Sequence, residues 1–144
     1  GLQNGATHTE FIRGKADGKW YFLETSSRVG GAHIPDLVEA SSGINIWREW
    51  AKIEDALLRN KSYEVAKPTG FSAGLIIALA KELKPDYEEF ECEEVVRFLQ
   101  IDYHVGVVYK SDKMEMVQQR LDEAAEKIND HHLNILPQKS KPSS

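Results

Sequence analysis

Two glutamates, an arginine and a pair of glycines lie close together in the N-terminal part of the sequence. Glu10 and Glu24 each stand in a run of aromatic and β-branched residues, and Arg28 precedes Gly30 and Gly31. Carboxylate oxygens are preferred ligands of Mg²⁺, which usually shares its coordination shell with nucleotide phosphates. A nearby arginine can cover a phosphoryl oxygen as charge spreads in the transition state. The same residues are equally compatible with a surface hairpin whose glutamates are solvated and whose arginine makes an ordinary ion pair.

The two glutamates are expected on the two strands of a β-hairpin. Residues 8–13 and 20–25 are rich in β-branched and aromatic residues, and Asp17-Gly18 between them is a strong turn signal. A two-residue loop at Asp17-Gly18 would put the glutamates on opposite faces. A three-residue loop over 16–18, with Gly18 in the left-handed region, would make them direct cross-strand neighbours.

We favour the three-residue loop because of the apolar side chains that it brings together. It pairs Lys15 with Lys19 and Phe11 with Leu23, and we expect Phe11 and Leu23 to be buried together. It also leaves the two glutamates facing each other, which destabilises a plain sheet. A bound cation would remove this repulsion, since close carboxylates otherwise drive one of the pair to protonate.

This part of the sequence resembles the metal-binding segment of the ATP-grasp superfamily. The resemblance covers about residues 5–55 and is carried by HTEF at 8–11, YFLETSSRVGG at 21–31, GINIW at 43–47 and Trp50. In that superfamily, a Glu on one strand and a Glu and an Asn on the next hold one or two Mg²⁺ (or Mn²⁺) ions against the ATP phosphates. The resemblance implies the following roles in this chain: Glu10, Glu24 and Ser26 as metal ligands, Arg28 as the catalytic arginine, and Gly30, Gly31 and His33 as contacts to the nucleotide or substrate.

Two positions depart from the superfamily's patterns. Ser26 stands where the superfamily has Asn, and a neutral hydroxyl usually ligates Mg²⁺ more weakly. Ala32 stands where biotin carboxylase has the glutamate that activates bicarbonate, so the Gly30-Gly31 form looks more like the carboxylate–amine ligases. His33 is as well placed to cap the following helix as to contact substrate.

The rest of the sequence mixes strands with helices, which is typical of an α+β fold with helices packed on an antiparallel sheet. Helices are expected at 34–40, after Asn45 and after Asp112, and strands at 71–79, 95–101, 103–110 and 133–136. The segment 71–79 is also compatible with a helix. The last helix is marked by an apolar stripe and by Asp112 and Glu115, which have the spacing of a capping box.

The resemblance also implies a domain organisation. Residues 1–136 would be the C-terminal portion of an ATP-grasp domain, with a metal- and phosphate-binding segment at 1–60 and a C-terminal subdomain at 61–136. The polar residues 137–144 are expected to be a disordered tail. The lid lysines and the adenine-binding hinge of the superfamily have no counterpart in the sequence. We therefore expect the chain alone to be inactive and to bind Mg·ATP weakly.

The implied function is that of a C-terminal fragment of an ATP-dependent, Mg-requiring carboxylate ligase, of the carboxylase or carboxylate–amine ligase type, that forms an acyl-phosphate intermediate. Its full-length parent would bind ATP, Mg²⁺ and a small carboxylate substrate. Biotin carboxylase and carbamoyl-phosphate synthase are further members that the segment resembles. The rival hypothesis is a non-catalytic packing or dimerisation domain descended from such a ligase, with Ser26 marking the decay of the site. A homodimer is compatible with either hypothesis.

Composition excludes several other classes. The net charge of −5 argues against binding to a nucleic-acid backbone, and the longest apolar run, 73–80, is too short to span a membrane. The single cysteine, Cys92, excludes a disulfide framework and suits a reducing cytoplasm. We therefore expect a cytoplasmic protein.

Other side chains offer weaker candidates for chemistry. Adjacent histidines such as His131 and His132 are expected to point apart at a helix end and so not to chelate a metal. Cys92 has no nearby base in the sequence and is expected to be a partly buried, unreactive thiol. Trp47 and Trp50 have helical spacing with apolar neighbours, which favours packing in the core.

Overall fold

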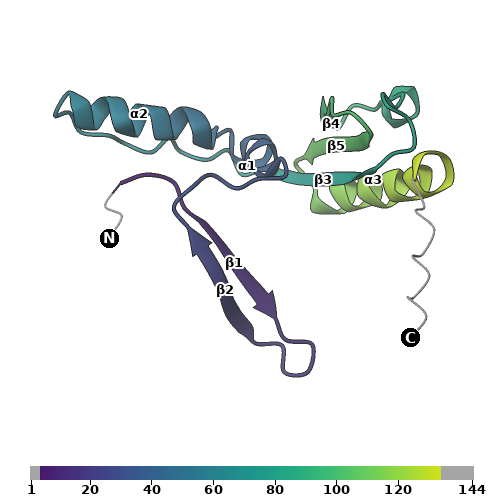
Figure 1. Cartoon of the computed structure of the whole chain (residues 1–144), viewed down its shortest axis with the longest axis horizontal. Helices are drawn as coiled ribbons and strands as arrows, with labels where there is room; N and C mark the ends of the chain where they lie inside the picture. Colours follow the sequence, from purple (N-terminus) through teal and green to yellow (C-terminus); the bar gives the residue numbers. More distant parts are fainter. Residues whose placement is uncertain (1–3, 134–144) are drawn as a thin grey trace, which may run out of the picture. The chain divides into compact units, whose positions relative to one another are not determined.

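A computed structural model of the chain describes residues 4–133 and has an α+β fold, as predicted. The elements are β1 (His8–Arg13), β2 (Trp20–Ser26), α1 (Ile34–Ser42), α2 (Ile46–Leu58), β3 (Ser72–Leu79), the 3₁₀ turn η1 (Glu88–Phe90), β4 (Val95–Phe98), β5 (His104–Ser111), α3 (Met114–Lys127) and the π-helical turn η2 (Ile128–His132) (Figure 1). The chain divides into two compact units between Phe71 and Ser72. The division predicted after residue 60 lies in the loop between α2 and β3.

Strands β1 and β2 form the predicted antiparallel hairpin, but its turn is one residue longer than predicted. The N–H of Gly14 donates a hydrogen bond to the Lys19 carbonyl at 2.8 Å, so the loop runs from Lys15 to Gly18. The predicted pairing of Lys15 with Lys19 is therefore wrong. The Asp17 carboxylate stabilises the longer turn by accepting a hydrogen bond from the Lys19 N–H at 3.1 Å. Gly18 has a φ of 67°, in the left-handed region as expected.

The register of the hairpin shifts between Glu10 and Phe11. Phe11 pairs with Phe22 instead of Leu23, and the two rings make an edge-to-face contact with centroids 6.0 Å apart. The predicted joint burial of Phe11 and Leu23 is also wrong, because they are 55% and 54% exposed. Glu10 and Glu24 are direct cross-strand partners all the same, as predicted.

The two helices of the first unit begin and end where local signals place them. Helix α1 has Pro35 in its first turn and ends at Gly43, which has a φ of 73° and donates its N–H to the Glu39 carbonyl at 2.8 Å. The side-chain oxygen of Asn45 caps helix α2 by accepting a hydrogen bond from the Arg48 N–H at 2.9 Å. Both boundaries follow the usual preference for Asn at the start of a helix and Gly after its end.

Helix α2 buries a charged residue and exposes a tryptophan. Glu49 is 7% exposed and accepts hydrogen bonds from Lys52 Nζ at 2.8 Å and the Tyr63 hydroxyl at 2.9 Å, which together lower the pKa of its carboxyl. Trp47 is 56% exposed and stacks on Trp50, with ring centroids 6.1 Å apart. The prediction that Trp47 packs in the core is therefore wrong.

The second unit is built on a three-stranded antiparallel sheet with the order β3-β5-β4 (Figure 1). Strand β3 confirms the preferred interpretation of segment 71–79 and pairs with β5 from Ser72↔Ser111 to Leu79↔His104. Strand β5 is buried from Val105 to Tyr109, as befits a central strand. The largest fully buried side chains in the described part of the chain all belong to this unit: Phe90, Leu99, Val105, Val107, Val108 and Val117.

Helix α3 packs on this sheet but is not capped as predicted. It begins at Met114 with Lys113 in the N-cap position and no side-chain capping bond. The side chain of Asp112 accepts a hydrogen bond from the Ser111 hydroxyl at 3.3 Å instead. The capping box of Asp112 with Glu115 is wrong because the helix begins one position later than that box requires.

The structure also limits two predictions about the C-terminus. The predicted strand at 133–136 is represented by one isolated bridge between Ala80 and Leu133. Residues 134–136, like the predicted tail at 137–144, lie outside the described residues. None of the helices within residues 4–133 is long and apolar enough to cross a membrane.

Candidate metal and phosphate site

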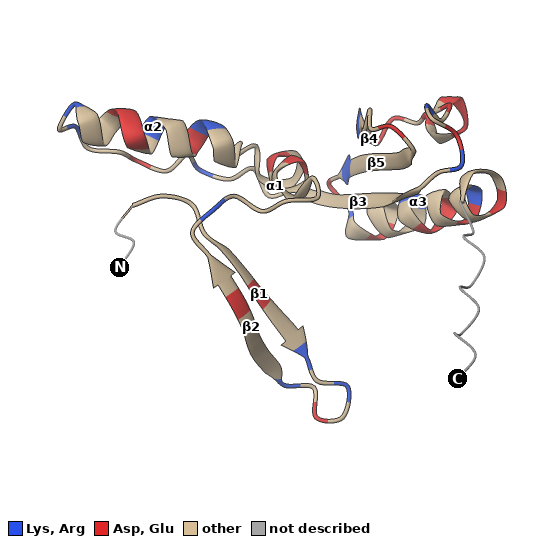
Figure 2. Cartoon of the chain, in the orientation of Figure 1, with Lys and Arg blue, Asp and Glu red and all other residues tan. Residues whose placement is uncertain are grey.

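Glu10 and Glu24 form an acidic pair across the hairpin. Each strand carries one acidic residue at the same level (Figure 2), and their direct pairing puts both side chains on one face. The Glu10 side chain is 44% exposed and Glu24 is also exposed. Within residues 4–133, no lysine or arginine lies at ion-pair distance from either carboxylate. The pair therefore offers several oxygens to a cation from solvent.

His8 is the side chain that contacts this pair. Its Nε2 lies 3.0 Å from Oε1 of Glu10, and the imidazole is 14% exposed, so it is much more buried than the carboxylate it contacts. No role was predicted for His8 from the sequence. The sequence did contain one signal for this contact: His8 and Glu10 are two residues apart, so their side chains lie on the same face of a strand.

Ser26 lies on the same face as the glutamates. It pairs with His8 across the hairpin, two residues beyond Glu24, and its side chain is partly buried. The register thus brings three predicted metal ligands onto one face: Glu10, Glu24 and Ser26. Thr9 and Thr25 occupy the other face, where their hydroxyl oxygens lie 2.8 Å apart.

The loop after β2 carries the predicted phosphate-binding residues. Arg28 donates from its guanidinium to the Val29 carbonyl at 3.1 Å, and Val29 is buried. Gly30 is packed against neighbours, whereas a Cβ added to Gly31 would meet nothing within 4 Å. The backbone at Gly31 is therefore open enough for a phosphate to approach.

His33 has a structural contact of its own. It stands at the N-cap position of α1 with a φ of 61°, but its side chain makes no capping bond to the backbone. Its Nδ1 lies 2.8 Å from Oδ2 of Asp36 in the first turn. This contact orients the imidazole, and the role of His33 toward a nucleotide or substrate stays a prediction.

The ligand set fits a hard cation better than a transition metal. No group of three or more His, Cys, Asp and Glu side chains in the described part of the chain could hold a metal by itself. Two opposed carboxylates and a hydroxyl supply only oxygens, and Mg²⁺ completes such sets with water and substrate phosphates. Within residues 4–133, the one basic side chain at ion-pair distance from either glutamate is His8, 3.0 Å from Glu10. We therefore regard the residues as compatible with Mg²⁺ or Mn²⁺.

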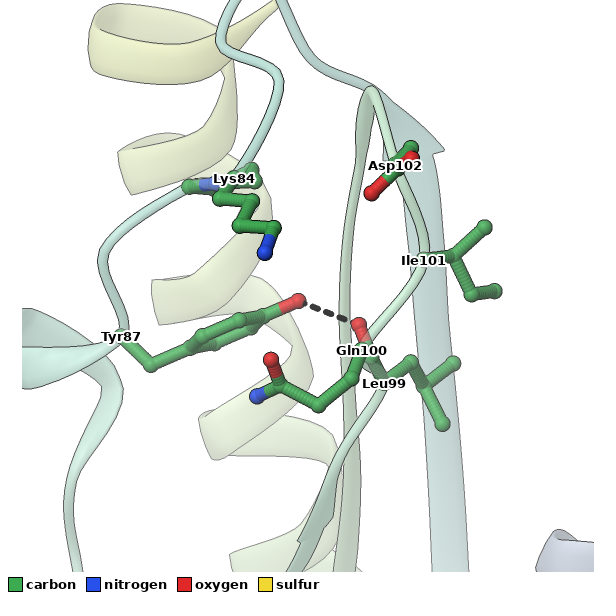
Figure 3. Close-up of a pocket in the computed structure, with 7 residues that line it drawn as sticks. Lys84, Tyr87, Leu99, Gln100, Ile101 and Asp102 are labelled. Carbon is green, nitrogen blue, oxygen red and sulfur yellow. Dashed lines mark hydrogen bonds between the residues drawn. The ribbon is translucent and has the colours of Figure 1, made fainter.

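The second unit contains a small cavity of about 190 Å³ beside the loop between β4 and β5. Figure 3 shows its lining, including Lys84, Tyr87, Gln100 and Asp102. The Tyr87 hydroxyl donates a hydrogen bond to the Leu99 carbonyl at 2.6 Å, so it is used to hold the loop. The cavity contains none of the residues predicted to act in catalysis.

The two adjacent histidines near the end of α3 converge, contrary to prediction. His131 Nδ1 and His132 Nε2 lie 2.9 and 2.8 Å from the two carboxylate oxygens of Glu89. Burial raises the pKa of the Glu89 carboxyl, but the hydrogen bonds from the two imidazoles together lower it by more, so the net shift of the pKa is downward. The π-helical turn explains the convergence, because its wider spacing changes the directions of successive side chains.

Cys92 is partly buried, as expected. Burial raises the pKa of its thiol, which disfavours the reactive thiolate.

Comparison with solved structures supports the predicted fold. The chain is similar to the crystal structure of phosphoribosylglycinamide synthetase from Anaerococcus prevotii, with a TM-score of 0.53 and 19% sequence identity. The similarity covers 87% of this chain and 36% of that chain, so this chain spans about a third of the neighbour's length. At this identity the likeness bears on the fold alone and not on the activity of this chain. No sequence-family model and no curated protein matches the chain.

Proposed function

We propose that the chain is the metal- and phosphate-binding part of an ATP-dependent carboxylate–amine ligase. The observation that carries this proposal is the direct pairing of Glu10 with Glu24 on one exposed face of a hairpin. The fold that the chain shares with phosphoribosylglycinamide synthetase is compatible with this proposal. The reaction would activate a small carboxylate as an acyl-phosphate, which an amine then attacks.

In this proposal the hairpin residues bind the metal ion, and the residues of the following loop contact the phosphate. Glu10 and Glu24 would hold a divalent ion, with Ser26 as a weaker third ligand. When bound, Mg²⁺ or Mn²⁺ would neutralise charge on the transferring phosphoryl group. Arg28 would cover a phosphoryl oxygen, which requires its guanidinium to leave the Val29 carbonyl. The open backbone at Gly31 would let a phosphate oxygen reach the main chain.

The second candidate function is a non-catalytic packing or dimerisation domain descended from such a ligase. Exposed apolar side chains favour it, since Trp20 and Phe22 on the hairpin are 68% and 59% exposed and Leu58 on α2 is 84% exposed. Ser26, in place of the superfamily's asparagine, also favours it. Such surfaces mark places where another protein surface packs.

Turnover of the full-length protein distinguishes the two functions. Glu24→Gln keeps the shape of the side chain and removes one charge from the metal ligands. We expect turnover to fall at least a hundredfold, about 2.7 kcal/mol of transition-state stabilisation. Thr25→Val is the matched control, because it changes the next residue on the opposite face and should leave turnover within about threefold. A Glu24→Gln protein that works at the unmodified rate would favour the non-catalytic function.

A further inference from the structure

His8 is held between Gly30 on one side and Glu10 on the other. A Cβ added to Gly30 would lie 2.5 Å from His8 Nδ1 and 3.1 Å from Cε1, so the ring packs directly on the glycine. The opposite ring nitrogen, Nε2, lies 3.0 Å from Oε1 of Glu10. The proposed mechanism gives neither this imidazole nor this close approach any role.

The contact fixes one oxygen of Glu10 and leaves the other available. Metal binding orders a glutamate side chain, which costs conformational entropy. A hydrogen bond that already holds the carboxylate before the metal binds reduces this cost. Nε2 bonds Oε1, and no hydrogen-bond partner of Oε2 lies among residues 4–133, so this second oxygen is available to a cation. Glu24 has no such restraint within the described residues.

The position of His8 is itself fixed by the absence of a side chain at residue 30. Neither Gly30 nor Gly31 has a positive φ, so alanine is compatible with the backbone at both positions. The two glycines differ in their surroundings: Gly30 touches the imidazole, whereas Gly31 faces open space. The requirement for glycine at residue 30 is therefore steric: the nearest atoms to an added Cβ belong to His8, and Ile34 Cγ2 follows at 3.2 Å.

We infer that His8 is a positioning residue that orients Glu10 for the divalent cation, and that Gly30 is glycine because it must admit the imidazole. This inference rests on the proposed function, since it concerns the same metal site. Hydrogen-bond partners of metal-ligating side chains typically change metal affinity by 10–100-fold when they are removed.

The test measures Mn²⁺ affinity of the whole chain by electron paramagnetic resonance, without nucleotide, for a set of His8 variants. His8→Ala and His8→Asn should bind Mn²⁺ about 10–100-fold more weakly, because neither places a donor at the Nε2 position. His8→Gln should bind within about threefold of the unmodified chain, since its amide nitrogen can occupy that position. This rescue would not follow from a merely structural role.

Gly30 supplies the second arm of the test. Gly30→Ala should weaken Mn²⁺ binding to a similar extent as His8→Ala, because the added methyl group displaces the ring. Thr9→Ala, on the other face of the hairpin, should leave Mn²⁺ affinity unchanged. Circular dichroism identifies any variant that does not fold, and if His8→Ala is among them, the comparison of His8→Asn with His8→Gln decides.

Glu10→Gln and Glu24→Gln separate failure of this inference from failure of the proposed function. If they weaken Mn²⁺ binding while His8→Ala and His8→Asn bind as tightly as the unmodified chain, the positioning role is overturned and the metal site stands. If both glutamine variants bind Mn²⁺ normally, the metal site is overturned and the role of His8 with it.

Discussion

Glu10 faces Glu24 because Leu23, between them and the turn, is bulged out of the strand pairing of β2. Near the turn, Phe11 pairs with Phe22. If this register continued along the strands, the next pair would be Glu10 with Leu23. Glu24 would then lie on the other face of the hairpin. The register shift at Leu23 restores the pairing of the two carboxylates. A local irregularity of this kind re-aims side chains and often occurs beside functional sites.

Deletion of Leu23 should therefore preserve the pairing of Glu10 with Glu24. Without Leu23, Glu24 directly follows Phe22, so the strand pairing set next to the turn continues without a bulge and every remaining residue keeps its partner. We expect backbone cross-strand nuclear Overhauser effects between residues 10 and 24 in the deletion variant, as in the unmodified chain. Insertion of one glycine directly before Glu24 is the matched change, and it should remove these effects. Loss of the pairing on deletion would show that the irregularity is not what sets the register.

Gly74 on β3 should not tolerate a methyl group. A Cβ at this position would lie 2.7 Å from side-chain carbons of both Leu121 and Val117 on α3. Overpacking of this kind usually costs about 1–3 kcal/mol. We expect Gly74→Ala to lower the free energy of unfolding by that amount in chemical denaturation. The double variant with Val117→Ala should recover part of the loss, and a Gly74→Ala chain of unchanged stability would contradict the packing described.

Acid should destabilise the second unit through Glu94. Hydrogen bonding to Arg120, 3.0 Å away, holds the pKa of the Glu94 carboxyl below its ordinary value of 4.5. The unfolded chain then binds the proton more readily, so the stabilisation is complete above pH 4.5 and is lost as the pH falls through the lowered pKa. Glu94→Gln should flatten the fall of melting temperature between about pH 5 and pH 3. An equally steep fall in the variant would show that this pair contributes nothing to the acid response.

Local signals were sufficient for much of the fold and for part of the site. The aromatic strands with Asp17-Gly18 between them predicted the hairpin, and Asn45 and Gly43 predicted helix boundaries, because each feature acts within a few residues. The opposed glutamates were also predicted, although through a three-residue turn and without the bulge at Leu23 that in fact produces the pairing.

The errors arise where a side chain's surroundings depend on contacts that no local pattern specifies. Phe11 was expected to be buried because apolar side chains usually are, yet the hairpin leaves it exposed. The convergence of His131 and His132 on Glu89 depends on a π-helical turn and on a contact between segments over 40 residues apart. His8 was missed because its importance comes from its packing on Gly30, which is 22 positions away along the chain.

The central claim is that a divalent cation binds between Glu10 and Glu24, and crystals of the full-length protein grown with Mn²⁺ and a non-hydrolysable ATP analogue would test it most directly. Anomalous scattering locates manganese independently of the protein model. We predict a peak within about 2.0–2.3 Å of one oxygen of each carboxylate and of a phosphate oxygen, since oxygen ligands of small divalent ions lie near this distance. A manganese peak bound to the phosphates with both carboxylates turned away from it would contradict the claim.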